Sequence, residues 1–198
     1  MRRRWGGLEI DSAKASQAVD MVAHRGRADT PGGKGRSIVK DLVVDMLASR
    51  GVRLEQIARI VVELQRPYRP DLTVDECLRS VEKVLEKREV QHAVLTGIAL
   101  DMLAESDALP EPLLSLVKTD DPLYGVDEIL ALSITNIYGT VGLTNFGYVD
   151  KRKMGVLRGL NAQAGRSGSR VNTFLDDLVA GIAGAAAARI AHRGEAAG

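Results

Sequence analysis

Apolar side chains recur every three or four residues along most of the chain, which is the spacing that places them on one face of an α-helix. Runs that alternate apolar and polar residues, as a half-buried strand would, are absent. We therefore expect an all-α protein. The pattern predicts helices that start at residue 37, after Gly51 and after Thr73, and further helices over 90–105, 111–118, 126–138, 149–160 and 172–192.

Local signals fix some of the helix ends. The prolines of RPYRPDL, residues 66–72, cannot continue a helix, so the second helix should end before them. Thr73 and Glu76 form a capping-box signature ahead of the third helix. Residues 1–36 are rich in Arg, Gly, Asp and Ser, with the turn chemistry of RADTPGGKGR. We predict a flexible N-terminal extension over 1–36, one helical domain over 37–192 and a short tail over 193–198.

Composition narrows the class of protein. The 27 basic and 26 acidic residues leave a formal charge of +1, which gives no global signal for nucleic acid. A lone Cys77, at an apolar helix position, excludes an intrachain disulfide and fits a reducing cytosol. The opening MRRRWGG has no apolar segment behind it, and no apolar run is long enough for a membrane span. We expect a cytoplasmic protein without a transmembrane span, able to sit at the inner face of the membrane.

Two predicted helices carry adjacent acids in otherwise apolar surroundings. Asp176 and Asp177 precede a run that is uncharged until Arg189, and Asp127 and Glu128 precede a run that is uncharged as far as residue 138. A helix that is apolar on all sides is normally central, and a buried carboxylate is costly unless it is compensated. Acids are also favoured in the first turn of any helix, so either pair alone has a simpler explanation.

The positions within each pair suggest different depths. Neighbours on a helix point about 100° apart, so we expect one acid of each pair to face inward. Asp177 aligns with Gly181, Gly184 and Ala188, a stripe of small side chains that lets another backbone approach. Asp177 is therefore predicted to be the deeper acid, and the same stripe would also suit a homo-oligomer.

A third acidic position suggests that the two acid pairs bind a metal ion. Asp150 precedes the basic cluster 151–153, and acids that converge in an apolar interior indicate a bound divalent cation, with oxygen ligands favouring Mg²⁺. The nearby Lys and Arg side chains would then suit a phosphate. Thr144 and Asn145, in the Gly-rich segment 139–148, could donate to that phosphate, although a tight interhelical turn explains the segment nearly as well. The remaining candidates lack the spacing of a site: His24, His92, His192, Cys77 and PGGKGRS over 31–37.

Three blocks of the chain resemble the phosphatidylglycerophosphatase A family, in particular its soluble Gram-positive branch. DPLYGVDEILAL carries Asp121, Pro122 and the pair at 127 and 128; YVDKRKMG carries Asp150 and Lys153; FLDDLVAG carries the pair at 176 and 177. Their order and spacing match the family over about residues 37–192. The resemblance implies a compact helical bundle in which one helix is surrounded by the others.

The resemblance also implies a Mg²⁺-dependent phosphatase that converts phosphatidylglycerophosphate, a phospholipid substrate met at the membrane surface, into phosphatidylglycerol. Combined with the residue pattern, it predicts the direct or water-mediated metal ligands Glu128, Asp150 and Asp177. Asp127 and Asp176 would support them or act as the general base, and Lys153 would stabilise the phosphoryl charge. The remaining predicted phosphate contacts are Lys151, Arg152, Thr144 and Asn145, and the predicted membrane-docking residues are Lys151, Arg152, Lys153 and Arg158.

Two other classes of function stay open. A helical nucleotide pyrophosphatase, or another hydrolase of soluble phosphate esters, would use acids spaced i, i+3 on paired helices, and Glu86 and Glu89 begin such a pattern. A non-enzymatic oligomerisation module would use the acid pairs as helix caps and the small-residue stripe as its interface.

Overall fold

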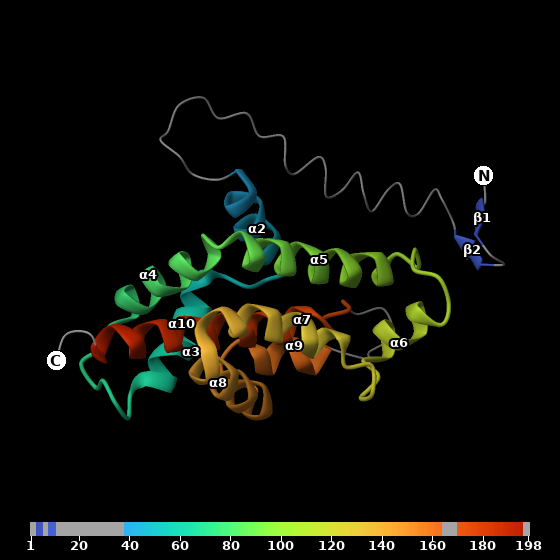
Figure 1. The fold of residues 1–198 in the computed structure, drawn as a ribbon. Helices are drawn as coiled ribbons and strands as arrows, with labels where there is room; N and C mark the ends of the chain where they lie inside the picture. The colour runs from blue at the N-terminus through green and yellow to red at the C-terminus, as the bar shows by residue number, and fades with distance from the viewer. Residues whose placement is uncertain (1–2, 6–7, 11–37, 164–169, 196–198) are drawn as a thin grey trace.

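The computed structural model describes residues 3–5, 8–10, 38–163 and 170–195, and it confirms the all-α class (Figure 1). The segment PGGKGRS and His24 lie outside the described residues. The helices, in chain order, are α2 (Ile38–Ser49), α3 (Leu54–Gln65), α4 (Val74–Leu85), α5 (Arg88–Glu105), α6 (Leu113–Thr119), α7 (Val126–Thr135), the 3₁₀-helix η1 (Asn136–Tyr138), α8 (Gly139–Arg152), α9 (Leu157–Gln163) and α10 (Leu175–Glu195).

The two ends of the chain contain regular structure. Strands β1 (Arg3–Trp5) and β2 (Leu8–Ile10) pair antiparallel within the predicted N-terminal extension. At the other end, α10 continues to Glu195, into the predicted tail.

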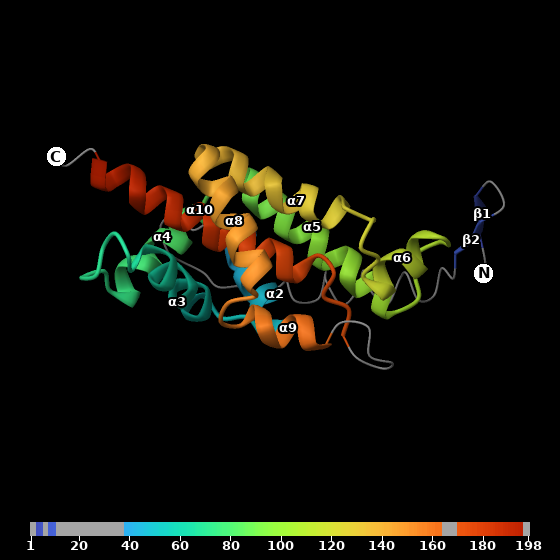
Figure 2. The ribbon, with the colours of Figure 1, turned by 90° about the horizontal axis from the view of Figure 1, so that it is seen from below.

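Helix α10 is the central element of the bundle. Every residue from 171 to 188 is buried, and α10 packs against α3, α4, α5, α7, α8 and α9. Figure 2 shows α3 and α4 on one side of α10 and α7 on the other, with α8 crossing α10. From Leu178 to Ala188 the helix consists only of Leu, Val, Ala, Gly and Ile, so this part can be enclosed without burying a polar side chain. The expectation of one surrounded helix is confirmed.

The small-residue stripe on α10 is filled by the protein's own helices. A Cβ at Gly181 would lie 3.1 Å from the carbonyl oxygen of Ala131 on α7. A Cβ at Gly184 would lie 2.9 Å from both the carbonyl oxygen of Gly142 and the amide nitrogen of Phe146 on α8. The predicted close backbone approach is confirmed, and the use of this stripe as an oligomer interface is wrong because it is buried within one chain.

Helix α7 is not a second central helix, so that prediction is wrong. Ile129 is 65% exposed, and only one face of α7 packs, chiefly against α5 and α10. Exposed apolar residues occur just before α7, on α7, in η1 and on α8: Leu123, Val126, Ile129, Ile137, Val141, Leu143 and Tyr148. By length and composition alone, the stretch Val126–Arg152 could cross a membrane. The uncharged sequence of α7 therefore includes an exposed apolar face as well as a buried one.

The predicted helix over 149–160 is interrupted between α8 and α9, and the segment 139–148, for which a tight turn was one of two interpretations, is helical. Gly139 adopts φ 71°, a left-handed backbone region that favours glycine, and it separates η1 from the following turns of α8. The other glycines of that segment lie inside α8, which then ends at Lys153 (φ 44°) and is followed by Gly155 (φ 54°). Of the three glycines in 139–148, Gly139 alone has a positive φ, and the other two are helical.

Other local predictions are confirmed. The Thr73 amide donates to Glu76 Oε2 at 3.0 Å, and the Glu76 amide donates to Thr73 Oγ1 at 3.3 Å. This is the reciprocal pairing of a capping box. Helix α3 ends at Gln65, just before the proline-containing segment. Cys77 is fully buried in the core, and burial raises the pKa of its thiol to about 11.

Candidate metal and phosphate site

The acidic blocks meet in one pocket of about 220 Å³, where the start of α10 faces the start of α7 and the end of α8. Its charged lining consists of seven carboxylates and one ammonium group: Asp120, Asp121, Asp127, Glu128, Asp150, Asp176, Asp177 and Lys153. All six residues predicted as catalytic therefore line the same pocket. Their chemical roles remain predictions.

The first turn of α10 is held in place by a buried acid on α5. The two carboxylate oxygens of Asp101 accept hydrogen bonds from the amides of Phe174 (3.1 Å) and Leu175 (3.0 Å). N–H groups at a helix start have no partner within the helix, so these bonds satisfy them. Arg50 reinforces this loop through Asn172 Oδ1 at 3.1 Å and Glu105 at 2.6 Å. These contacts fix the backbone from which the α10 acid pair projects.

Lys153 connects two of the acidic blocks. Its Nζ donates to Asp150 Oδ1 at 2.5 Å and to Asp176 Oδ2 at 2.8 Å. Burial lowers the pKa of Lys153, but the two carboxylates outweigh it and leave the pKa above its ordinary value. The ammonium is thus held charged between α8 and α10.

The α10 acids are strongly perturbed. Burial raises the pKa of Asp176 to about 6 despite the ion pair with Lys153. Burial, with the neighbouring charges of Asp176 and Asp150, raises the pKa of Asp177 to about 9. The pKa values of Asp127 and Asp120 are raised as well, chiefly by burial. The pocket holds more negative charge than its protein surroundings stabilise.

The donor set suits a hard cation. All seven acidic groups offer oxygen, the ligand atom that Mg²⁺ prefers, and Asp127 Oδ1 is buried without a hydrogen-bond partner. No three acidic, His or Cys side chains among the described residues are grouped as a preformed metal cage. Instead, Lys153 balances two of the carboxylates. The oxygen donors of these residues fit Mg²⁺. Two of the carboxylates that could bind it, those of Asp150 and Asp176, also form ion pairs with Lys153.

The two acids on α7 differ in burial. Asp127 is buried, whereas Glu128, predicted as a direct or water-mediated metal ligand, is exposed at the pocket rim. On α10 both acids are buried, Asp176 at 7% and Asp177 at 4% exposure, so the structure does not single out one inward acid. Both acids of a pair can be enclosed because the surrounding helices cover the first turn of α10 from several sides.

Four predicted phosphate contacts do not line the pocket. The side chains of Lys151 and Arg152 are exposed, and Arg152 lies 5.9 Å from the centre of the Tyr148 ring. Thr144 Oγ1 donates to carbonyl oxygens of its own helix, at Thr140 and Val141, and Asn145 Nδ2 is buried without a partner. Because 139–148 is helical, these side chains are spread around α8 instead of converging on one loop.

Asp120 and Asp101 were missed as contributors to this region. Asp120 follows α6 in a left-handed conformation (φ 52°) and lines the pocket beside Asp121. The adjacent acids 120 and 121 form a third pair, the same signal that drew attention to the other two. Asp101 is the one charged residue in the stretch LTGIALDML of α5, and an unpaired charge at a buried helical position would have marked it.

The i, i+3 pattern on α4 and α5 lies outside this pocket. Glu86 accepts from Lys83 at 2.9 Å and from Lys40 at 3.4 Å, and Glu89 is exposed. Likewise His92 and His192 are exposed. These four residues therefore lie on the surface, outside the acidic pocket in which the predicted catalytic residues meet.

Comparison with known proteins places the chain in a family. The family model for phosphatidylglycerophosphatase A matches residues 24–192, which include every acidic residue of the pocket. The chain belongs to the phosphatidylglycerophosphatase A family. Family membership indicates a phosphatidylglycerophosphatase-like function, and the match begins within the segment that we expected to be an extension.

Relatives with similar sequences and folds are known from bacteria. The chain is 59% identical over 152 residues to the uncharacterized protein YpjQ of Bacillus subtilis, covering 77% of this chain and 84% of that protein. It is 54% identical over 147 residues to YutG of the same organism, covering 74% of this chain and 87% of that protein. The crystal structure of the low temperature requirement C protein from Listeria monocytogenes is similar with a TM-score of 0.78 at 50% identity, over 81% of this chain and 99% of that one.

Proposed function

We propose that this family member is a Mg²⁺-dependent phosphatase that hydrolyses phosphatidylglycerophosphate to phosphatidylglycerol and phosphate. The observation that carries the proposal is the excess of acidic groups in the pocket, seven against one ammonium. A phosphate monoester is itself anionic, so it needs added positive charge to enter such a pocket. A bound divalent cation provides that charge.

The residues that would hold Mg²⁺ are the more enclosed acids, Asp127, Asp150, Asp176 and Asp177, with Glu128 at the exposed rim. When bound, Mg²⁺ neutralises phosphate oxygens and lowers the pKa of an attacking water. Asp127 is the candidate to take the proton of that water, because its Oδ1 has no hydrogen-bond partner and burial raises its pKa.

Lys153 has two tasks in this proposal. It orients Asp150 and Asp176 through the two ion pairs, and its ammonium stabilises charge on the transferred phosphoryl group. Those ion pairs make Lys153 unsuitable for membrane docking, which leaves Lys151, Arg152 and Arg158 as the exposed cations of this region.

The lipid would reach the pocket along the exposed apolar residues of α7 and α8. Leu123, 94% exposed, and Val126, 48% exposed, are sequence neighbours of the pocket residues Pro122 and Gly125. Apolar side chains at this rim can contact acyl chains, while exposed basic residues contact anionic headgroups at about 1 kcal/mol each. We infer a cytoplasmic protein that docks peripherally at the inner face of the membrane.

A substrate panel tests the proposal. Phosphate release is measured on phosphatidylglycerophosphate in anionic vesicles, glycerol 3-phosphate, nucleoside monophosphates and pyrophosphate, each with Mg²⁺ and with chelator. We expect the lipid to be hydrolysed fastest, hydrolysis to require Mg²⁺, and Asp177→Asn to reduce turnover by at least about a hundredfold. Asp75→Asn, at an exposed acid on α4, is the matched control. A strong preference for a soluble ester would overturn the lipid assignment and favour a soluble-ester hydrolase.

A further inference from the structure

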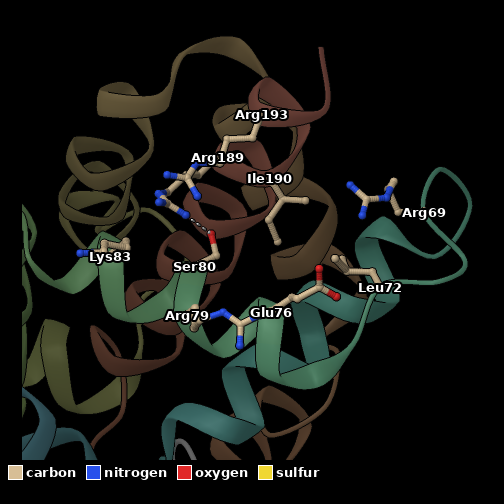
Figure 3. A pocket seen from close by; sticks show the side chains of 9 residues that line it. All are labelled: Arg69, Leu72, Glu76, Arg79, Ser80, Lys83, Arg189, Ile190 and Arg193. Carbon is tan, nitrogen blue, oxygen red and sulfur yellow. Dashed lines mark hydrogen bonds between the residues drawn. The ribbon is translucent and has the colours of Figure 1, made fainter. Parts of the chain in front are cut away.

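A second pocket, of about 370 Å³, lies between α4 and the C-terminal half of α10 and has the opposite charge (Figure 3). Its charged lining has five cations and one acid: Arg69, Arg79, Lys83, Arg189, Arg193 and Glu76. The chain as a whole has a formal charge of only +1. The excess of cations is therefore a local feature, assembled from the segment after α3, from α4 and from α10.

Three of these cations have no acidic partner among the described residues. Arg69 is 3.3 Å from Asp71, and Lys83 is 2.9 Å from Glu86. In the described part of the chain, no carboxylate lies at ion-pair distance from the other three, Arg79, Arg189 and Arg193. The acid in the lining, Glu76, accepts hydrogen bonds from Thr73 in the capping box.

Arg189 is positioned by the fold. Its Nη1 donates to Ser80 Oγ at 3.3 Å, and the Ser80 hydroxyl donates to the carbonyl oxygen of Ala186 at 3.0 Å. Figure 3 shows Arg189 and Arg193 projecting from α10 together, with Arg69 across the pocket beyond Ile190 and Leu72. Burial, together with the charge of Arg193, lowers the pKa of Arg189.

Arg189 and Arg193 repel each other, and the more distant charge of Glu86 and the C-terminal dipole of α10 offset this only partly. A phosphate oxyanion would offset it further, because its oxygens accept forked hydrogen bonds from Arg. The lining also includes the apolar side chains of Leu72 and Ile190, on the side of the pocket toward Arg69, which an organic group on that phosphate could contact. We propose that the α4–α10 pocket is a second, non-catalytic binding site for a phosphate group, either free or in an anionic lipid headgroup, held by Arg189 and Arg193 with Arg79.

This site is separate from the acidic pocket. Both Asp177 and Arg189 lie on α10, with more than three helical turns of sequence between them. The two pockets also share no lining residue. The proposal does not depend on the phosphatase assignment, since it rests on other residues and predicts binding without a divalent cation.

The test is calorimetric titration of the full chain with inorganic phosphate and with pyrophosphate, in chelator and at constant ionic strength. Wild type should bind, and Arg189→Gln and Arg193→Gln should each bind about tenfold more weakly or worse, the scale of one lost charge-assisted hydrogen bond. Arg59→Gln, an equal charge change at an exposed position on α3, should bind like wild type. Arg193 is exposed, so Arg193→Gln should remain folded. It therefore tests the site even if Arg189→Gln unfolds.

A second arm identifies the source of the phosphate. Co-sedimentation compares neutral vesicles with vesicles that contain phosphatidylglycerol, using the same variants. Vesicle binding that Arg189→Gln and Arg193→Gln weaken, but Arg59→Gln does not, supports the site with a lipid headgroup as its ligand. Binding of soluble phosphate alone supports the site with a free phosphate. The proposal is overturned if wild type binds neither probe, or if all three variants bind alike.

Discussion

At the residue scale, Asp127 and Glu128 show how one residue of register changes the role of a carboxylate. Asp127 is 8% exposed with an unpartnered Oδ1, while Glu128 reaches solvent at the rim of the same pocket. Exposed charges are screened by water, so their contribution to a site is small, whereas an enclosed carboxylate acts at a low local dielectric.

This difference predicts unequal effects on activity. Asp127→Asn should lower turnover by at least about a hundredfold, and Glu128→Gln by less than about tenfold. Steady-state phosphate release checks this, with Asp75→Asn as the control for loss of an exposed acid. Equal losses in the two variants would mean that burial does not decide which acid of the pair acts.

The α10 acids predict the pH dependence of stability without Mg²⁺. Their pKa values, about 6 for Asp176 and about 9 for Asp177, lie above the ordinary value of 3.8. Between the ordinary and the raised pKa the folded chain holds more protons than the unfolded chain, so the free energy of unfolding falls as pH rises. The stabilisation is complete below about pH 4 and is lost towards about pH 9.

Urea unfolding in chelator across this pH range measures the effect. Stability of the wild type should decrease from about pH 6 to about pH 9, and Asp177→Asn should remove most of that decrease because the amide does not titrate. Asp75→Asn should keep the wild-type slope. A flat wild-type profile over this range would contradict the raised pKa of Asp177.

At the element scale, close packing of α10 against α8 depends on a position without a side chain. A Cβ at Gly184 would lie 2.9 Å from backbone atoms of α8, which cannot move aside as a flexible side chain can. Gly147 lies on α8 itself, is exposed, and would place a Cβ near no other atom within 4 Å.

The two glycines therefore predict opposite effects of alanine. Gly184→Ala should lower the free energy of unfolding by about 1–3 kcal/mol or more through overpacking. Gly147→Ala should raise it by up to about 1 kcal/mol through helix propensity. Urea denaturation measures both, and a Gly184→Ala chain as stable as wild type would mean that the helices do not meet this closely.

At the scale of the whole molecule, residues from three parts of the chain share one charged pocket. A cation that binds only the folded chain stabilises it in proportion to the logarithm of its concentration above the dissociation constant. The melting temperature should accordingly rise with Mg²⁺, and Asp177→Asn should lose most of the gain while Asp75→Asn retains it. Equal melting temperatures in saturating Mg²⁺ and in chelator would remove the proposed metal site.

Much of the fold could be read from the sequence because helical periodicity is a local property. The apolar spacing predicted most helices, and the run of Ala and Gly after Asp177 predicted the enclosed α10. The acid pairs also identified the residues that line the pocket, since a charge beside a long apolar run is visible without coordinates.

The remaining features required the tertiary structure, because periodicity describes one helix and not its neighbours. Only packing decided that α7 exposes its outer face, that Asp127 rather than Glu128 is enclosed, and that Asp101 holds the start of α10. The basic pocket is likewise assembled from segments remote along the chain, with Ser80 on α4 in contact with Arg189 on α10. The sequence by itself determined which side chains are ionisable and which segments are helical. The tertiary structure decided which charges meet and which are screened by water, since both depend on distances between segments that are far apart in the sequence.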